Sequence, residues 1–149
     1  MSSAPTLREA EQYFHDRIPL TRAMGVRVVV ADQGQFVVEA PVSLNSNHLG
    51  TAFGGSINAV ALLAAYGLLW SAVRERNLQV VVVESSIQFQ RPVRDTIRAV
   101  CSRPSLPEWQ KFQEEIESTG RARITLLVEV VEGDQIAARL TGIFLARTG

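Results

Sequence analysis

The stretch that decides the fold reads NHLGTAFGGSINAVALLAAYGLLWSAV and spans residues 47–73. It starts as a polar, glycine-rich loop and passes at Gly54-Gly55 into a run with very few polar side chains. A helix that is apolar on every side needs cover on more than one side, and its many alanines allow close approach of other backbones. The stretch therefore predicts a long buried helix that begins at Gly54-Gly55.

A membrane span is the alternative reading of this helix. Residues 57–73 approach the minimum of about 17 residues for a bilayer helix. Strand-like segments lie on both sides, however, and no second apolar span follows. A single span would tether two incomplete sheets, so we expect a core helix and no membrane partner.

The rest of the chain reads as two further helices and six strands. The capping-box spacing at Thr6–Glu9 starts an N-terminal helix, and Ser105–Glu108 starts another that Gly120 closes. Valine-rich or alternating segments between turn signals predict strands. They cover residues 25–31, 35–42, 79–91, 95–102, 121–131 and 135–146.

Length and element order favour one α+β domain over residues 1–149. A chain of this size with 46% hydrophobic residues supports a single core. Every strand connection allows antiparallel pairing, so we expect an antiparallel sheet wrapped around the long central apolar helix. A curved sheet of this kind, supported by a partner subunit, would supply the cover that the helix needs.

Charge and cysteine content limit the possible partners and compartment. Acidic and basic residues balance at 15 each, which argues against a nucleic-acid-binding face. The one cysteine, Cys101, excludes an intrachain disulfide and a thiolate metal cluster. The N-terminal segment lacks a basic region followed by an apolar run. We expect a cytoplasmic protein without a metal.

The loop before the long helix is the candidate site. First-turn amides of a helix are unpaired and carry partial positive charge, and glycines let a ligand approach them. Gly54 or Gly55 could therefore donate to a developing oxyanion, as acyl transfer requires. The alternative is that the glycine pair only makes a tight turn and Ser56 caps the helix.

Two polar residues of this loop could take part in chemistry. His48 could act as a general base on water, and Asn47 could orient that water or hold a substrate carbonyl. A solvated His48 that caps a turn is the alternative. His15, on the N-terminal helix, is a weaker candidate.

The segment QVVVVESSIQFQR, residues 79–91, offers two more candidates. Glu84 is an acid in a strand that we expect to be central, although a salt bridge at an edge or interface also explains it. Ser85, on the face toward the helix, could touch a ligand, or could be a core hydroxyl bonded to backbone. A nucleophilic serine is not favoured, because no G-x-S-x-G elbow occurs. Alternation places Val81, Val83, Ser85, Ile87 and Phe89 on the helix side.

The runs NHLGTAFGGSINAVALLAAYGLLW and VVVESSIQFQRPV resemble the hotdog-fold thioesterases, above all those typified by the YiiD C-terminal domain. The resemblance extends over nearly the whole chain in element order. It implies hydrolysis of acyl-CoA or acyl-carrier-protein thioesters by a homodimer or a dimer of dimers, with sites at the subunit interface. Coenzyme A would enter only as part of the substrate, and no separate cofactor is implied.

In better-known relatives, an Asn, a backbone amide at a glycine pair and an acid about two helical turns further on share the chemistry. Asn47 matches the Asn and Gly54-Gly55 the glycine pair. Phe53 stands where those relatives have a histidine, and Leu62 stands near the position of the acid. The resemblance therefore leaves the proton-transfer group open.

Three readings follow from this departure. His48 or Glu84 of a second subunit supplies the missing group, or the domain mainly binds thioesters without turnover. A hydratase or dehydratase shares the fold but needs a histidine with a carboxylate partner.

Other residues could contact the substrate. Arg91 and Arg94 could meet coenzyme A phosphates, and Trp109 or Phe112 could line an acyl tunnel. The candidate substrate-binding residues are Thr51, Phe53, Gly54, Ser56, Glu84 and Ser85.

Overall fold

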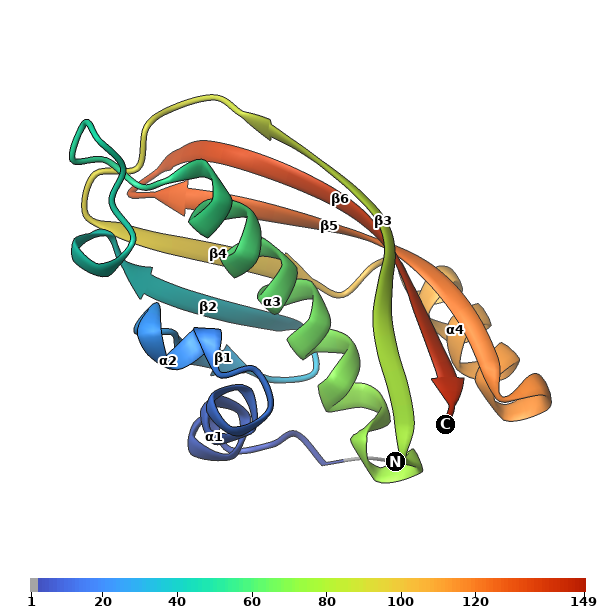
Figure 1. Ribbon diagram of the computed structural model, residues 1–149. Coiled ribbons are helices and arrows are strands. Elements are labelled where there is room, and N and C mark those ends of the chain that lie inside the picture. The colour runs from blue at the N-terminus through green and yellow to red at the C-terminus, as the bar shows by residue number, and fades with distance from the viewer. Residues whose placement is uncertain (1–2) are drawn as a thin grey trace.

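The computed structural model describes residues 3–149 as a curved six-stranded antiparallel sheet wrapped around one long helix, α3 (Figure 1). This confirms the expected α+β arrangement. The elements are α1 (Leu7–Arg17), α2 (Leu20–Ala23), β1 (Arg27–Ala31), β2 (Gln35–Pro41), η1 (Val42–Leu44), α3 (Gly54–Val73), η2 (Arg74–Arg76), β3 (Leu78–Phe89), β4 (Thr96–Ser102), α4 (Leu106–Thr119), β5 (Arg121–Glu132) and β6 (Gln135–Thr148).

The strand order across the sheet is β1-β2-β4-β5-β6-β3. Two predicted hairpins form neighbouring pairs, β1 with β2 and β5 with β6. The first turn is fixed by Asp32, whose carboxylate accepts from the amides of Gly34 and Gln35 at 2.8 Å. The second turn uses Gly133 with a positive φ of 63°, a backbone conformation that favours glycine.

The central helix α3 begins at Gly54-Gly55, as predicted, and packs against β2, β4, β5, β3 and β6. Residues 54–76 have the length and apolarity of a membrane span, and 61% of the apolar 18-residue stretch within them is buried inside the protein. That share is typical of a core helix in a folded domain. The close approach expected of small residues occurs at Gly67, which the buried ring of Phe36 contacts so tightly that a Cβ there would overlap it.

The two predicted helix signals outside α3 are also confirmed. Thr6 and Glu9 form a complete capping box at α1. Ser105 accepts from the Glu108 amide at the start of α4, and Gly120 ends that helix with φ of 72°. Strand β2 contacts α1 through Phe36 and Phe14, whose ring centroids lie 5.9 Å apart.

Strand β3 departs from the prediction in two ways. A bulge between Val82 and Glu84 shifts the register, so the helix side carries Val82, opposite buried Phe144, rather than Val81. Beyond the bulge, Ser85 and the residues alternating with it face the helix as predicted. The strand is also an edge strand in the single chain and not a central one. Strict alternation failed because one extra residue reverses the faces.

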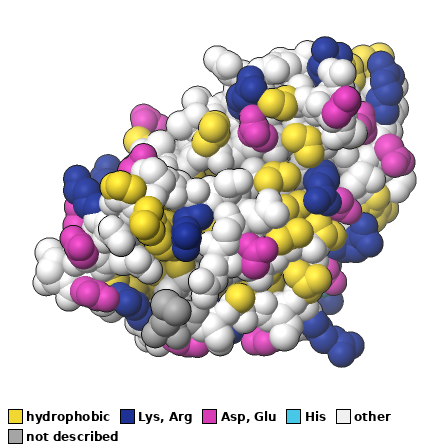
Figure 2. Space-filling view, turned by 180° about the vertical axis from the view of Figure 1, so that it is seen from behind, with side chains coloured by type: hydrophobic (Ala, Val, Ile, Leu, Met, Phe, Trp, Pro, Cys, Tyr) yellow, Lys and Arg dark blue, Asp and Glu magenta, His cyan; other side chains and the backbone are white. Residues whose placement is uncertain are grey.

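The outer face of the sheet is charged with both signs. Figure 2 shows arginines and acids interspersed with apolar side chains on the face turned away from α3 in Figure 1. Glu39 bridges Arg27 and Arg98, and Glu129 pairs with Arg139. The face shown therefore carries no single-sign field of the kind that attracts nucleic acid.

Candidate functional site

The loop from β2 to α3 is held in place by Asn45, a buried residue that sequence reasoning missed. Its side-chain amide donates to the carbonyls of Met24 and Pro41 at 2.9 and 2.8 Å. Its own carbonyl accepts from the Phe53 amide at 2.8 Å. Asn45 thus joins α2, β2 and the start of α3, and fixes where the helix N-terminus points.

Asn47 organises the tip of the same loop. Its side-chain oxygen accepts from the amides of Leu49 and Thr51, and its nitrogen donates to the Thr51 hydroxyl and the Ala52 carbonyl. The two ends of the amide are therefore engaged inside the loop. Its geometry suits positioning of the loop better than direct contact with a substrate.

The first turn of α3 presents free backbone donors. Phe53 is the N-cap residue, with extended backbone, and no side chain caps the helix, so the alternative in which Ser56 is the cap is wrong. Within residues 3–149, the amides of Gly54 and Gly55 have no hydrogen-bond partner. The Phe53 ring lies over Gly55, and the Phe89 ring lies beside Gly54. The turn is therefore an open donor site between two exposed aromatic rings.

The other predicted loop residues differ in their exposure. His48 is exposed, and its ring forms no hydrogen bond with the described part of the chain. Thr51 and Ser56 are half-buried. His15, by contrast, is bonded through Nε2 to the Val26 carbonyl at 2.9 Å and is used structurally. Only His48 of the two histidines is free to meet water or substrate.

Ser85 and Glu84 separate in space. Ser85 pairs with Gly142 on the α3 side of the sheet, whereas Glu84 pairs with Ile143 and projects from the outer face. Both side chains are exposed because β3 is an edge strand. Within one chain, therefore, the structure brings Ser85 to the α3 side and leaves Glu84 on the outer face.

An apolar groove of about 240 Å³ opens beside α3. At about 100° per residue, Ala59, Leu62 and Tyr66 share one helix face with Gly55. The Tyr66 hydroxyl lies 3.0 Å from that of Tyr13, and burial raises the pKa of Tyr66 well above its usual range. The groove is thus apolar and uncharged, with walls from Ile18, Leu20, Thr21, Met24, Ala59, Leu62, Leu63, Tyr66, Val82 and Phe144.

The remaining predicted contact residues divide between two other places. Arg94 lines a shallow cavity of about 440 Å³ between η1 and the start of β4, close to Gly50 of the loop. Arg91 is exposed. Trp109 lines a cavity on the opposite side of α3, and Phe112 is buried. Neither residue lines the apolar groove on the Gly55 face of α3, because α4 packs against β5.

Cys101 is a buried core residue, and the side chains that could bind a metal are scattered over residues 3–149. Burial raises the pKa of Cys101 to about 12, so this thiol is a core group without thiolate character. Across residues 3–149, no group of three or more His, Cys, Asp or Glu side chains is arranged to hold a metal ion. The chemistry available at the site is that of backbone amides, one free imidazole and an apolar groove.

Known proteins share this sequence pattern and this fold. The model of the putative thioesterase family, YiiD C-terminal type, matches residues 7–148. A protein of unknown function from Chlorobaculum tepidum TLS is 27% identical, with a TM-score of 0.90 over 99% of both chains. A protein from Pseudomonas aeruginosa, described as a probable thioesterase, is 19% identical, with a TM-score of 0.86 over 100% of both chains.

A third solved structure extends the comparison. The putative thioesterase from Shewanella oneidensis is 22% identical, with a TM-score of 0.79 over 96% of this chain and 97% of its own. The six-stranded antiparallel sheet around a long apolar helix is common to these structures, so the hotdog fold expected from the sequence is confirmed.

Proposed function

The chain belongs to the putative thioesterase family of the YiiD C-terminal type, and from this membership we propose that it hydrolyses acyl thioesters of coenzyme A or acyl-carrier protein. One observation carries the proposal. The unpaired Gly55 amide and the apolar groove lie on the same face of α3, so a thioester carbonyl and its acyl chain can be bound together.

The proposed reaction uses the amide as an oxyanion donor. Water attacks the thioester carbonyl, and the negative charge that develops on the carbonyl oxygen is stabilised by the Gly55 N–H at the positive end of α3. His48 takes the proton from the attacking water. The carbonyl then re-forms as the C–S bond breaks, and His48 returns its proton to the leaving thiolate, giving a carboxylic acid and a thiol. Asn47 acts as a positioning residue that holds the loop carrying His48.

Arg94 supports the coenzyme A form of the substrate. Arg94 lines a cavity that also includes Ser46 and Gly50 from the loop before α3. The backbone there is fixed, because the Glu132 carboxylate accepts from the amides of Arg94 and Asp95. A phosphate bound by Arg94 would therefore lie beside the loop that precedes the oxyanion donor.

The test of the proposal is thiol release from a panel of short- to long-chain acyl-CoAs. We expect turnover above buffer for at least one chain length, and a loss of about 100-fold or more in His48→Ala if the imidazole is the general base. A correctly folded protein that binds the panel without releasing thiol would instead be a non-catalytic acyl-CoA-binding module. A hydratase is not favoured, since His48 has no carboxylate partner among residues 3–149.

Leu62→Trp is expected to shorten the acyl chain that the enzyme accepts. Leu62 lies in the groove seven residues after Gly55, about 10 Å along the helix axis. An indole there would fill the far part of the groove. We expect kcat/KM to fall by more than about tenfold for dodecanoyl-CoA and to change little for butyryl-CoA. Leu127→Trp, at an exposed leucine of β5 on the outer sheet face, is the matched control. Equal losses for both chain lengths would contradict a chain-binding groove.

We also propose that two copies of the chain pair through β3. This 12-residue edge strand exposes unpaired backbone groups, and Val81, Val82 and Val83 are each 44% exposed. Pairing would cover these valines and make one continuous sheet. In such a sheet Glu84 would stay on the outer face, opposite the acyl groove.

Val81→Lys is expected to convert the dimer to a monomer. A charge on each copy near the paired edges would repel its counterpart and lose apolar burial. Molar mass by light scattering checks this, and Leu7→Lys is a control of nearly equal exposure at 45%. A wild-type mass of one chain, or a dimer that survives Val81→Lys as well as Leu7→Lys, would argue against pairing through β3.

A further inference from the structure

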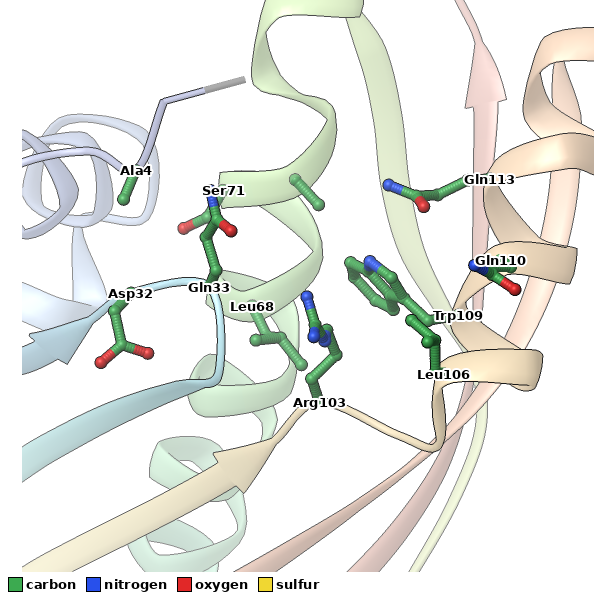
Figure 3. Close-up of a pocket in the computed structure, with 11 residues that line it drawn as sticks. Ala4, Asp32, Gln33, Leu68, Ser71, Arg103, Leu106, Trp109, Gln110 and Gln113 are labelled. Atoms are coloured by element: carbon green, nitrogen blue, oxygen red, sulfur yellow. The ribbon is translucent and has the colours of Figure 1, made fainter. Parts of the chain in front are cut away.

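A second cavity, of about 200 Å³, lies on the side of α3 away from the acyl groove. Figure 3 shows its walls, which come from α3, the β1–β2 turn, the segment after β4 and α4. The proposed thioesterase reaction uses none of these residues. At about 100° and 1.5 Å per residue, Ser71 lies about 160° around the helix from Gly55 and about 24 Å along its axis. A ligand in this cavity is therefore separate from one at the oxyanion donor.

The cavity combines an apolar platform with one cation. Leu106, which is 56% exposed, provides apolar surface beside the largely buried Trp109 and Leu68. The Arg103 side chain extends toward the Trp109 indole in Figure 3, and its guanidinium forms no ion pair within residues 3–149. Asp32 does not neutralise it, because the Asp32 carboxylate accepts from two turn amides and points away from Arg103.

The hydroxyl of Ser71, next to the cavity, is buried and unpaired within the described part of the chain. Ser71 is 8% exposed, and its Oγ has no hydrogen-bond partner in the described structure. A serine inside a helix ordinarily bonds back to the carbonyl four residues earlier, which Ser71 does not do. Buried polar groups without partners are rare and cost free energy unless something binds them. The Ser71 Oγ is itself closed off from solvent, so this hydroxyl lies behind the cavity wall and is not a contact for a ligand in the cavity.

We propose that this cavity binds a small organic carboxylate with a flat or apolar body. The carboxylate pairs with Arg103, and the body packs against Leu106 and Trp109. The volume lies below the about 300 Å³ at which pockets for drug-sized ligands begin, so the ligand is small.

The fluorescence of Trp109 provides a measurement of ligand binding in this cavity. The chain has two tryptophans, and Trp70 stacks on Tyr13 at 4.3 Å, on the groove side of α3. In a Trp70→Phe chain, Trp109 emission reports the cavity alone. Titration with phenylacetate is expected to give a saturable change, and the uncharged isostere phenylacetamide is expected to bind at least tenfold more weakly. No saturable change with phenylacetate, or equal binding of the amide, would overturn the proposal.

Variants in the same background test the assigned groups. Arg103→Gln is expected to raise the Kd for phenylacetate by about 10- to 100-fold, as for loss of a charge-assisted hydrogen bond. Arg123→Gln, at an exposed arginine on the outer sheet face, is expected to leave it unchanged. Equal effects of the two changes would refute a site at Arg103.

Discussion

Gly55→Pro is expected to lower kcat for thioester hydrolysis by about 100- to 1,000-fold, the cost of removing one oxyanion-hole donor. Proline lacks the amide hydrogen, and no intrahelical bond is lost, because the Gly55 amide is one of the unpaired donors of the first turn. The change therefore removes the proposed donor while α3 keeps its hydrogen-bond ladder. Steady-state kinetics on the preferred acyl-CoA measure it.

Gly55→Ala separates the donor from its surroundings. Alanine keeps the N–H but places a Cβ against the Phe53 ring, as proline also does. Phe53 is 56% exposed, so the ring can move aside. We expect Gly55→Ala to lose less than about tenfold in kcat, well short of the loss expected for an oxyanion donor. Equal losses in the two variants would assign the effect to crowding and not to the amide.

Much of the fold could be predicted because its signals are local. Thr6, Ser105 and Gly120 mark helix ends through hydrogen bonds and backbone angles that depend on a few neighbouring residues. The apolar run after Gly55 likewise needs no tertiary information to be recognised. The bulge in β3 has no such local mark, since several valines in a row read equally well in either register.

Only those parts of the site whose residues are close together in the sequence could be predicted. The glycine pair and the polar loop were evident, but the groove walls come from α2, α3, β3 and β6, which are far apart in sequence. The role of Asn47 was also hidden, since an amide that closes a loop and an amide that holds a carbonyl look alike in a sequence. Leu62 stands near the position of the relatives' acid, and the structure shows that it lines the apolar groove.

Phe36→Ala is expected to lower the free energy of unfolding by about 3 to 5 kcal/mol. Phe36 is fully buried between α3 and the ring of Phe14, so truncation leaves a cavity in the middle of the core. Gly67→Ala alone is expected to be destabilising too. Its Cβ would overlap the Phe36 ring, and this overpacking of about 1 to 3 kcal/mol exceeds the gain of about 1 kcal/mol from replacing a helical glycine.

The double variant decides whether that ring is the reason for Gly67. In the Phe36→Ala background the overlap is gone, so Gly67→Ala is expected to become stabilising, by up to about 1 kcal/mol, because only the helix-propensity gain and partial filling of the cavity remain. Urea unfolding of the four proteins gives the coupling free energy. If Gly67→Ala costs the same in both backgrounds, the glycine is required for another reason, and the close approach of β2 to α3 does not depend on it. A reversal of sign would show that the central helix needs a small residue at Gly67 because the Phe36 ring of the sheet packs directly against it.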